Sequence, residues 1–163
     1  MMVKTYCSSP FGSLEIIGSE LGIRSIRLVE ETDVQLESTV PALLEDGVRQ
    51  LQEYFDKKRQ QFSLQLDWSG APAFYQAVWK ELLDIPYGHT TYYSAIAEKL
   101  GAANKMRAVG QANGRNPIPI VVPCHRVIAK NGDLHGYYYG LDMKRKLLEL
   151  ENPMSFATQG RLF

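Results

Sequence analysis

The sequence of residues 118–128 is IPIVVPCHRVI, an apolar run that leads to a cysteine between a proline and a histidine. The run is typical of a buried strand. Pro123 lacks an amide donor and has a fixed φ, so we expect the strand to end there and a turn to begin. Neighbouring side chains on a strand point to opposite faces, whereas a turn lets Cys124 and His125 converge. We therefore take Cys124 as a candidate nucleophile and His125 as its candidate base.

The reactivity of a cysteine depends on its thiolate. A free thiol has a pKa of about 8.5, and a neighbouring imidazole can take its proton. A carboxylate that orients the far nitrogen improves such a base. The alternative is that Cys124 is a small buried apolar residue, which is the role we expect for Cys7. The two cysteines and three histidines show no ligand spacing, so we predict no metal site and no cofactor.

The composition is that of a folded globular protein of one domain or two small ones, since 45% of the 163 residues are apolar and 22% are charged. No apolar run approaches the ~20 residues of a membrane span, and the first residues form no apolar signal segment. Two cysteines make no disulfide framework, which favours a reducing compartment. We therefore expect a cytoplasmic protein with no membrane partner.

Charge is unevenly distributed, although the net charge is zero. Residues 1–69 contain 7 basic and 11 acidic residues, whereas residues 70–163 contain 11 basic and 7 acidic residues. Six basic residues and one acidic residue lie between positions 97 and 130, the basic ones being Lys99, Lys105, Arg107, Arg115, Arg126 and Lys130. Such a stretch binds an anion or forms an ordinary solvated surface, and charge alone favours neither.

The hydrophobic pattern changes near residues 67–71, which we take as a domain boundary. Before it, the pattern predicts an antiparallel meander over residues 3–29, a helix over 41–58 and a further strand over 62–66. After it, we predict helices from residue 72, over 92–100 with Thr91 as cap, over 105–113 with Asn104 as cap, and from Asp142 to Glu151. The fold class is α/β (α+β), with domains at 1–69 and 70–163.

The two short helices at 92–100 and 105–113, joined by a tight turn, are typical of a helix-turn-helix. The second has small residues, including Ala108 and Gly110, where a surface helix ordinarily has long ones. Small side chains permit close packing against another helix, or close approach to a DNA groove into which Arg107 reaches. The basic neighbourhood, which includes Arg115, favours DNA, and helix packing stays open as the alternative.

Most of residues 74–151 resembles the O6-alkylguanine-DNA alkyltransferase family, which repairs DNA by direct reversal. The resemblance rests on Pro123-Cys124-His125-Arg126-Val127 and on residues in the family's order and spacing. These are Phe74, Val78, Trp79, Ile85-Pro86-Tyr87-Gly88, Tyr93, Ile96, Ala97, Arg107-Ala108-Val109-Gly110, Asn116, Pro117, Gly132, Gly136, Tyr137, Gly140, Lys144, Leu147, Leu148 and Glu151. Residues 1–69 resemble, more weakly, the family's ribonuclease-H-like domain.

The resemblance implies a stoichiometric, irreversible transfer of the alkyl group from O6-alkylguanine, and from O4-alkylthymine, in double-stranded DNA to Cys124. The helix-turn-helix would bind the minor groove and the target base would be flipped out. Arg107 would fill the space that the base leaves, with Tyr93 promoting its rotation. We expect a monomer and leave cooperative assembly on DNA open.

The resemblance also implies roles inside the site. His125 would take the thiol proton through a water molecule, Glu151 would orient His125, and Asn116 would brace the turn. Tyr93 would donate a proton to guanine N3. The Val127 carbonyl would accept a hydrogen bond from the exocyclic amine of the base, and Pro119 and Tyr137 would flank the base. Tyr138 would offer its backbone amide to the substrate oxygen.

One departure from the family pattern concerns the loop after Gly136. Tyr138 and Tyr139 follow Tyr137 where the family usually has small residues. The two rings bear on the range of alkyl groups that can enter, rather than on the reaction. Two other functions are compatible with the residues alone: a non-catalytic module that recognises DNA lesions, and a hydrolase that uses Cys124 and His125.

Overall fold

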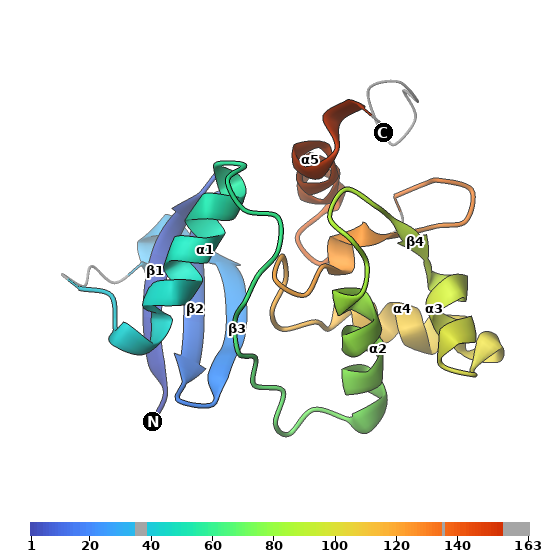
Figure 1. Ribbon diagram of the computed structural model, residues 1–163, viewed down its shortest axis with the longest axis horizontal. Helices are drawn as coiled ribbons and strands as arrows, with labels where there is room; N and C mark the ends of the chain where they lie inside the picture. The colour runs from blue at the N-terminus through green and yellow to red at the C-terminus, as the bar shows by residue number, and fades with distance from the viewer. Residues whose placement is uncertain (35–38, 135, 155–163) are drawn as a thin grey trace. The chain divides into compact units, whose positions relative to one another are not determined.

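The computed structural model describes residues 1–34, 39–134 and 136–154, which form two compact units (Figure 1). The first unit consists of residues 1–69 and the short segment 117–119. The second consists of residues 70–116 and the described residues of 120–154. The first is built on an antiparallel sheet and the second on helices, which confirms the mixed fold class predicted from the sequence.

An antiparallel three-stranded sheet is the framework of the first unit, and a helix lies across one of its faces (Figure 1). The elements are β1 (Val3–Ser9), β2 (Gly12–Ser19), β3 (Gly22–Val29) and α1 (Glu45–Phe55), with 3-10 turns η1 (Glu31–Asp33) and η2 (Ala42–Leu44). Register places Ile16 of β2 opposite Ile26 of β3, and both are buried. Leu44, Leu51 and Tyr54 are also fully buried, so the core lies between sheet and helix.

The strand predicted over residues 62–66 is wrong in extent. This segment makes one isolated parallel bridge, between Ile23 and Leu66. The Ile23 amide donates to the Gln65 carbonyl at 2.8 Å, and a Cβ on Gly22 (φ 128°) would lie 2.5 Å from that same oxygen. The alternating pattern indicated an extended backbone correctly, but it does not specify how many residues find a partner strand.

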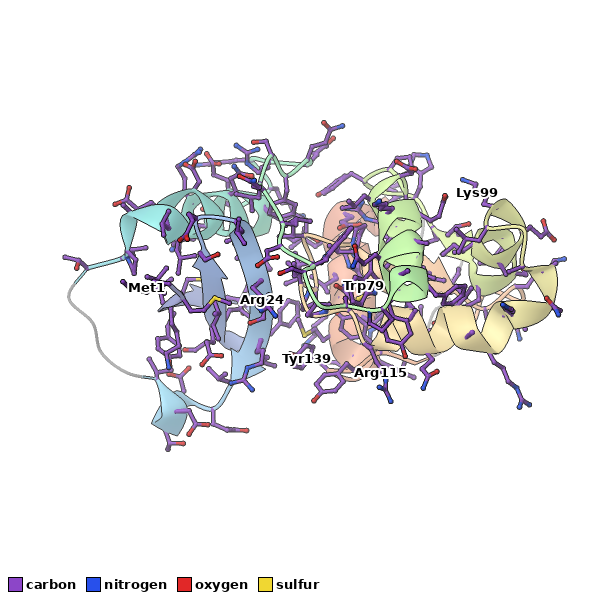
Figure 2. All side chains as sticks on the ribbon, turned by 90° about the horizontal axis from the view of Figure 1, so that it is seen from below. Met1, Arg24, Trp79, Lys99, Arg115 and Tyr139 are labelled. Atoms are coloured by element: carbon purple, nitrogen blue, oxygen red, sulfur yellow. The ribbon has the colours of Figure 1, made fainter. Side chains whose placement is uncertain are left out.

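Four helices dominate the second unit: α2 (Ala73–Leu83), α3 (Tyr93–Lys99), α4 (Met106–Gly114) and α5 (Leu141–Glu151). Shorter elements are η3 (Ala103–Lys105), η4 (Cys124–Arg126) and the strands β4 (Thr91–Tyr92) and β5 (Val127–Ile128). Helices α2 and α3 both pack against α4. Trp79 of α2, labelled in Figure 2, is buried and donates its Nε1–H to the Ala112 carbonyl of α4 at 2.8 Å.

The helix caps predicted at Thr91, Asn104 and Asp142 are wrong. Thr91 pairs with Val127 in the two-stranded sheet, so its backbone is extended and α3 begins only at Tyr93. Asn104 lies inside η3, which precedes α4, and Asp142 lies in the first turn of α5 rather than before it. Within the described ranges, no helix is both long and apolar enough to cross a membrane.

Candidate active site

A short parallel pairing brings two distant parts of the second unit together. Thr91 and Tyr92 of β4 pair with Val127 and Ile128 of β5. Tyr93 directly follows β4, and β5 directly follows the turn that contains Cys124. Burial raises the pKa of Tyr93, and the negative charge of a Cys124 thiolate adds to this rise, which indicates that the two side chains are near each other.

The turn at Pro123 positions Cys124. Pro123 has φ −82° and ψ 65°, and the Cys124 amide donates to the Val122 carbonyl at 2.8 Å, which is the geometry of an inverse γ-turn. Asn116 donates its Nδ2–H to the same carbonyl at 2.8 Å. A turn therefore begins at Pro123, as the sequence predicts, and the Asn116 side chain is bound to it. The strand expected before Pro123 is wrong, because residues 118–122 form bends, turns and isolated bridges rather than a strand.

Backbone strain accompanies this turn. Ile120, four residues before Cys124, has φ 75° although it is β-branched and fully buried. A branched residue in this left-handed region costs on the order of 1–3 kcal/mol, which the surrounding packing must offset. Strain of this kind is concentrated at functional sites, so its position supports the candidate site.

Three side chains form a buried ionic network next to Cys124. His125 Nε2 lies 2.8 Å from Glu151 Oε2. Arg126 donates from Nε to Glu151 Oε1 at 2.8 Å and from Nη2 to Oε2 at 2.9 Å. Its Nη1 donates to the Ile85 carbonyl at 2.7 Å, and its guanidinium lies 5.7 Å from the Tyr87 ring centroid. Arg126 is therefore an internal ion-pair partner, which corrects its inclusion among the basic residues available to an outside anion.

The network fixes the protonation state of His125. Burial lowers the pKa of His125, and although Glu151 opposes this, Arg126 reinforces it, so the imidazole is neutral near pH 7. Burial alone would raise the pKa of Glu151, but His125 and Arg126 outweigh it and hold the carboxyl well below its usual range. Since an ionised carboxylate can only accept, Nε2 carries the imidazole hydrogen. Nδ1 is then a lone-pair acceptor, and it has no hydrogen-bond partner in the described part of the chain.

The Cys124 thiol is protected from solvent and protonated at rest. Its residue is 5% exposed, and burial raises its pKa. Asn116, the Lys144 ammonium and the amides of Cys124 and His125 act in the opposite direction by stabilising the thiolate. The site therefore needs a base to generate the nucleophile, and it already contains groups that stabilise the product of that step.

Lys144 of α5 is fully buried beside this site. Its Nζ donates to the Val127 carbonyl at 2.6 Å and to the Gly136 carbonyl at 3.0 Å, and it lies 6.0 Å from the centroid of the Tyr93 ring. Burial lowers the pKa of Lys144 to about 8, while a Cys124 thiolate would raise it. Lys144 thus links β5 to Gly136 by hydrogen bonds and adds a positive charge near the thiol.

The aromatic loop, Tyr137–Tyr139, is internally packed. The Tyr137 and Tyr139 ring centroids are 6.3 Å apart and those of Tyr138 and Tyr139 are 4.8 Å apart, both edge-on. Burial, followed by the Cys124 thiolate, raises the pKa of Tyr137. Tyr138 is 78% exposed. Tyr137 is therefore the ring of this loop that faces the nucleophile, and Tyr138 is on the surface.

Tyr93, one of the predicted DNA-binding residues, begins α3, and the other four lie on α4 or just after it. Arg107 and Arg115 are exposed and Ala108 is half-buried. Arg115, like Lys99 at the end of α3, lies on the outside of the second unit (Figure 2). Gly110 instead faces Tyr93, because a Cβ added to it would lie 3.8 Å from that ring. The small residues of α4 thus serve close packing at Gly110 and leave an accessible surface around Arg107.

The two remaining residues of the predicted pocket, Pro119 and Val127, are both buried. Asn113, which the sequence did not single out, donates its Nδ2–H to the Cys124 carbonyl at 3.3 Å. Lys144 and Glu151, both named from the family resemblance, share one buried face of α5 with Leu147 and Leu148, where charged side chains are unexpected. Among the described residues no group of three or more His, Cys, Asp or Glu side chains could hold a metal ion.

Comparison with known proteins gives a consistent result over both units. Residues 73–153 match the DNA-binding domain of the 6-O-methylguanine DNA methyltransferase family, and residues 2–68 match its ribonuclease-like domain. A methylated-DNA–protein-cysteine methyltransferase of Mycobacterium leprae is 46% identical over 148 residues, 88% of each chain. The constitutive methylated-DNA–protein-cysteine methyltransferase of Bacillus subtilis is 43% identical over 155 residues, 90% of this chain and 93% of the other.

The chain is also similar to solved structures over most of its length. A crystal structure of O6-methylguanine methyltransferase from Mycobacterium tuberculosis, 42% identical, superposes with a TM-score of 0.82 and covers 94% of both chains. A crystal structure of OGT from the same organism in complex with DNA, 43% identical, has a TM-score of 0.82 and covers 92% of both chains.

Proposed function

The chain belongs to the 6-O-methylguanine DNA methyltransferase family, and on this premise we propose that it repairs DNA by accepting the alkyl group of O6-alkylguanine on the sulfur of Cys124, once per molecule. Cys124 Sγ attacks the alkyl carbon and the bond from that carbon to guanine O6 breaks. The thioether product has no route back to the thiol, so the protein is consumed with the lesion. Repair is therefore stoichiometric.

One observation carries this proposal: the acceptor nitrogen of His125 is buried and has no hydrogen-bond partner among the described residues, and the preceding residue is a buried cysteine with a protonated thiol. Glu151 binds the opposite nitrogen at 2.8 Å, and Arg126 keeps that carboxylate ionised. A water molecule between Nδ1 and the thiol relays the proton to His125 as the thiolate forms. Lys144 and Asn116 then stabilise the thiolate.

The DNA side of the proposal uses α3 and α4 as a helix-turn-helix against the minor groove. Arg107 is exposed in the first turn of α4, where it enters the duplex and fills the space of the extruded nucleotide. Extrusion is required because the O6 alkyl group is otherwise inside the base stack. Arg115 and the backbone around Ala108 contact the phosphates and the groove.

The flipped base lies against Tyr137, with its exocyclic amine donating to the Val127 carbonyl. Lys144 already binds that carbonyl, which keeps it oriented towards the base. Tyr93 protonates N3 so that guanine leaves as a neutral base, and the Tyr138 amide donates to the substrate oxygen. O4-alkylthymine presents a comparable alkyl oxygen and is a second substrate.

Incubation with duplex DNA containing a single O6-methylguanine tests the proposal. We expect one methyl group on the peptide that contains Cys124, guanine restored in the DNA, and a yield that never exceeds one lesion per protein molecule. Cys7→Ala is the matched cysteine control and should react normally, because Cys7 is a buried residue of the sheet with a pKa raised to about 11. Repair by Cys124→Ala, or repeated turnover, would contradict the proposal.

A further inference from the structure

We propose that Asn113 is a positioning residue of the transfer reaction, which holds the phenol of Tyr93 and the backbone of Cys124 in a fixed relation. The inference rests on the proposed function, in which Tyr93 protonates the base that Cys124 dealkylates. The sequence analysis did not single out Asn113. The role proposed for Asn113 differs from that of Asn116, whose side chain binds the turn at Pro123.

The geometry starts from one face of α4. Asn113, in the last turn of this helix, is 5% exposed and donates Nδ2–H to the Cys124 carbonyl at 3.3 Å. Gly110 is three residues earlier and therefore on the same face. A Cβ on Gly110 would lie 3.8 Å from the Tyr93 ring. One face of α4 therefore contacts both Cys124, the proposed nucleophile, and Tyr93, the proposed proton donor.

The hydrogen-bonding groups of Asn113 also support this role. Burial and the Cys124 thiolate raise the pKa of Tyr93 to about 12, and hydrogen bonding with Asn113 opposes this rise. A phenol with a lower pKa is a better proton donor to a leaving base. Asn113 Oδ1 is also buried, and among the described residues no group donates to it. A purely structural asparagine would have both ends of its amide paired, so the open oxygen points to a donor that arrives with the substrate.

The role follows from the balance of the step. The bond from Cys124 Sγ to the alkyl carbon forms as the bond from that carbon to O6 breaks, and the electron pair of the broken bond goes to the guanine ring. The Tyr93 proton moves to N3, and the phenolate later regains a proton from solvent. His125 releases the proton that it took from the thiol. Attack and protonation act on opposite sides of one base, so the rate depends on the separation of sulfur and phenol.

Asn113→Leu tests this role, because leucine keeps the approximate volume and removes both polar ends. We expect methyl transfer from O6-methylguanine DNA to slow roughly 10- to 100-fold, as is typical for a displaced catalytic group, with the affinity for duplex DNA unchanged. The reaction of Cys124 with iodoacetamide should keep its rate, since iodide leaves without a proton. In a Tyr93→Phe background, Asn113→Leu should add less than about twofold, because both changes interrupt the same step.

Asn113→Asp provides a second variant of matched size if the leucine variant does not fold. Its carboxylate cannot donate to the Cys124 carbonyl and would raise the pKa of Tyr93, so the same loss is expected. Wild-type transfer rates with either variant, equal slowing of the iodoacetamide reaction, or losses that multiply with Tyr93→Phe would each overturn the role of Asn113. If the wild-type protein accepts no methyl group, the proposed function fails and the inference with it.

Discussion

Replacing Arg126 with methionine should impair stability and chemistry together. The substitution removes two hydrogen bonds to Glu151, at 2.8 and 2.9 Å, and one to the Ile85 carbonyl at 2.7 Å. It also leaves the Glu151 carboxylate buried with His125 as its remaining partner in the network. The two consequences are separable, because one is measured by unfolding and the other by the pH dependence of the reaction.

The size of the stability loss follows from burial. Breaking one side of a buried ion pair costs about 3–5 kcal/mol, because the remaining charge is left uncompensated. A typical domain has a free energy of unfolding of about 5–15 kcal/mol, so the loss would be a large fraction of the total. Methionine fills much of the volume of the arginine stem, so little of the loss comes from a cavity.

The effect on chemistry follows from His125. The charge of Arg126 helps to lower the pKa of this imidazole, so Arg126→Met should raise it. A base works only when neutral, and a higher pKa means that a higher pH is needed to keep it neutral. The acid limb of the rate profile should therefore move to higher pH than in the wild type.

Urea unfolding and single-turnover methyl transfer across a range of pH measure the two effects. Arg145→Met is the control, because Arg145 lies on α5, the helix that contains Glu151, and pairs with the exposed Asp142 at 2.6 Å. Its unfolding midpoint and pH profile should match those of the wild type. Refutation would be a loss below ~1 kcal/mol for Arg126→Met, the range of surface pairs, with a rate profile that overlays the wild type.

Three further predictions concern other parts of the molecule. Arg107→Ala should slow repair of duplex DNA far more than reaction with a free O6-alkylguanine base, and equal slowing of both in parallel rate assays would contradict its role in the duplex. Because the pKa values of His125 and Glu151 are both lowered in the folded state, the unfolded chain binds protons more readily. The free energy of unfolding, measured by urea titration, should therefore fall below about pH 6.5 as His125 is protonated in the unfolded chain, and fall further below about pH 4.3 as Glu151 is protonated. A constant free energy of unfolding across this range would contradict the buried network. Trp79→Phe should cost about 0.5–1.5 kcal/mol in thermal unfolding, because it removes the 2.8 Å hydrogen bond to the Ala112 carbonyl, which keeps the Arg115 amide as a donor at 3.2 Å; an unchanged melting temperature would contradict a contribution of the Trp79 bond to stability.

The sequence predicted those parts of the fold that depend on local pattern. Alternation in residues 3–29 predicted the meander, and Pro123 predicted the turn at Cys124, because both depend on neighbouring residues. The strand expected over residues 118–122 does not form, because an apolar run alone does not supply a partner strand. The caps at Thr91, Asn104 and Asp142 were missed for the opposite reason. Thr91 in particular is extended because it pairs with Val127, a residue that no window around Thr91 contains.

The same distinction applies to the site. Cys124 and His125 are adjacent and could be named from composition and turn chemistry alone. Glu151 is a candidate carboxylate by composition alone, and only the family resemblance indicates its role, since 26 residues separate it from His125. The contact of Asn113 with Cys124 spans 11 residues and that of Arg126 with Ile85 spans 41. These partners follow from tertiary packing of α2, α4 and α5 around the turn that contains Cys124, which neither spacing nor charge in the sequence specifies.

The parallel pairing of β4 with β5 has a consequence for the order in which the chain folds. It joins Thr91 to Val127, so a loop of about 36 residues must close before Tyr93 and Cys124 can meet, at an entropic cost of roughly 3 kcal/mol beyond a constant. Contacts at this separation form late, after local helices. A nascent or partly unfolded chain therefore carries an ordinary cysteine, and its thiol gains its reactive surroundings only when the rest of the second unit is complete.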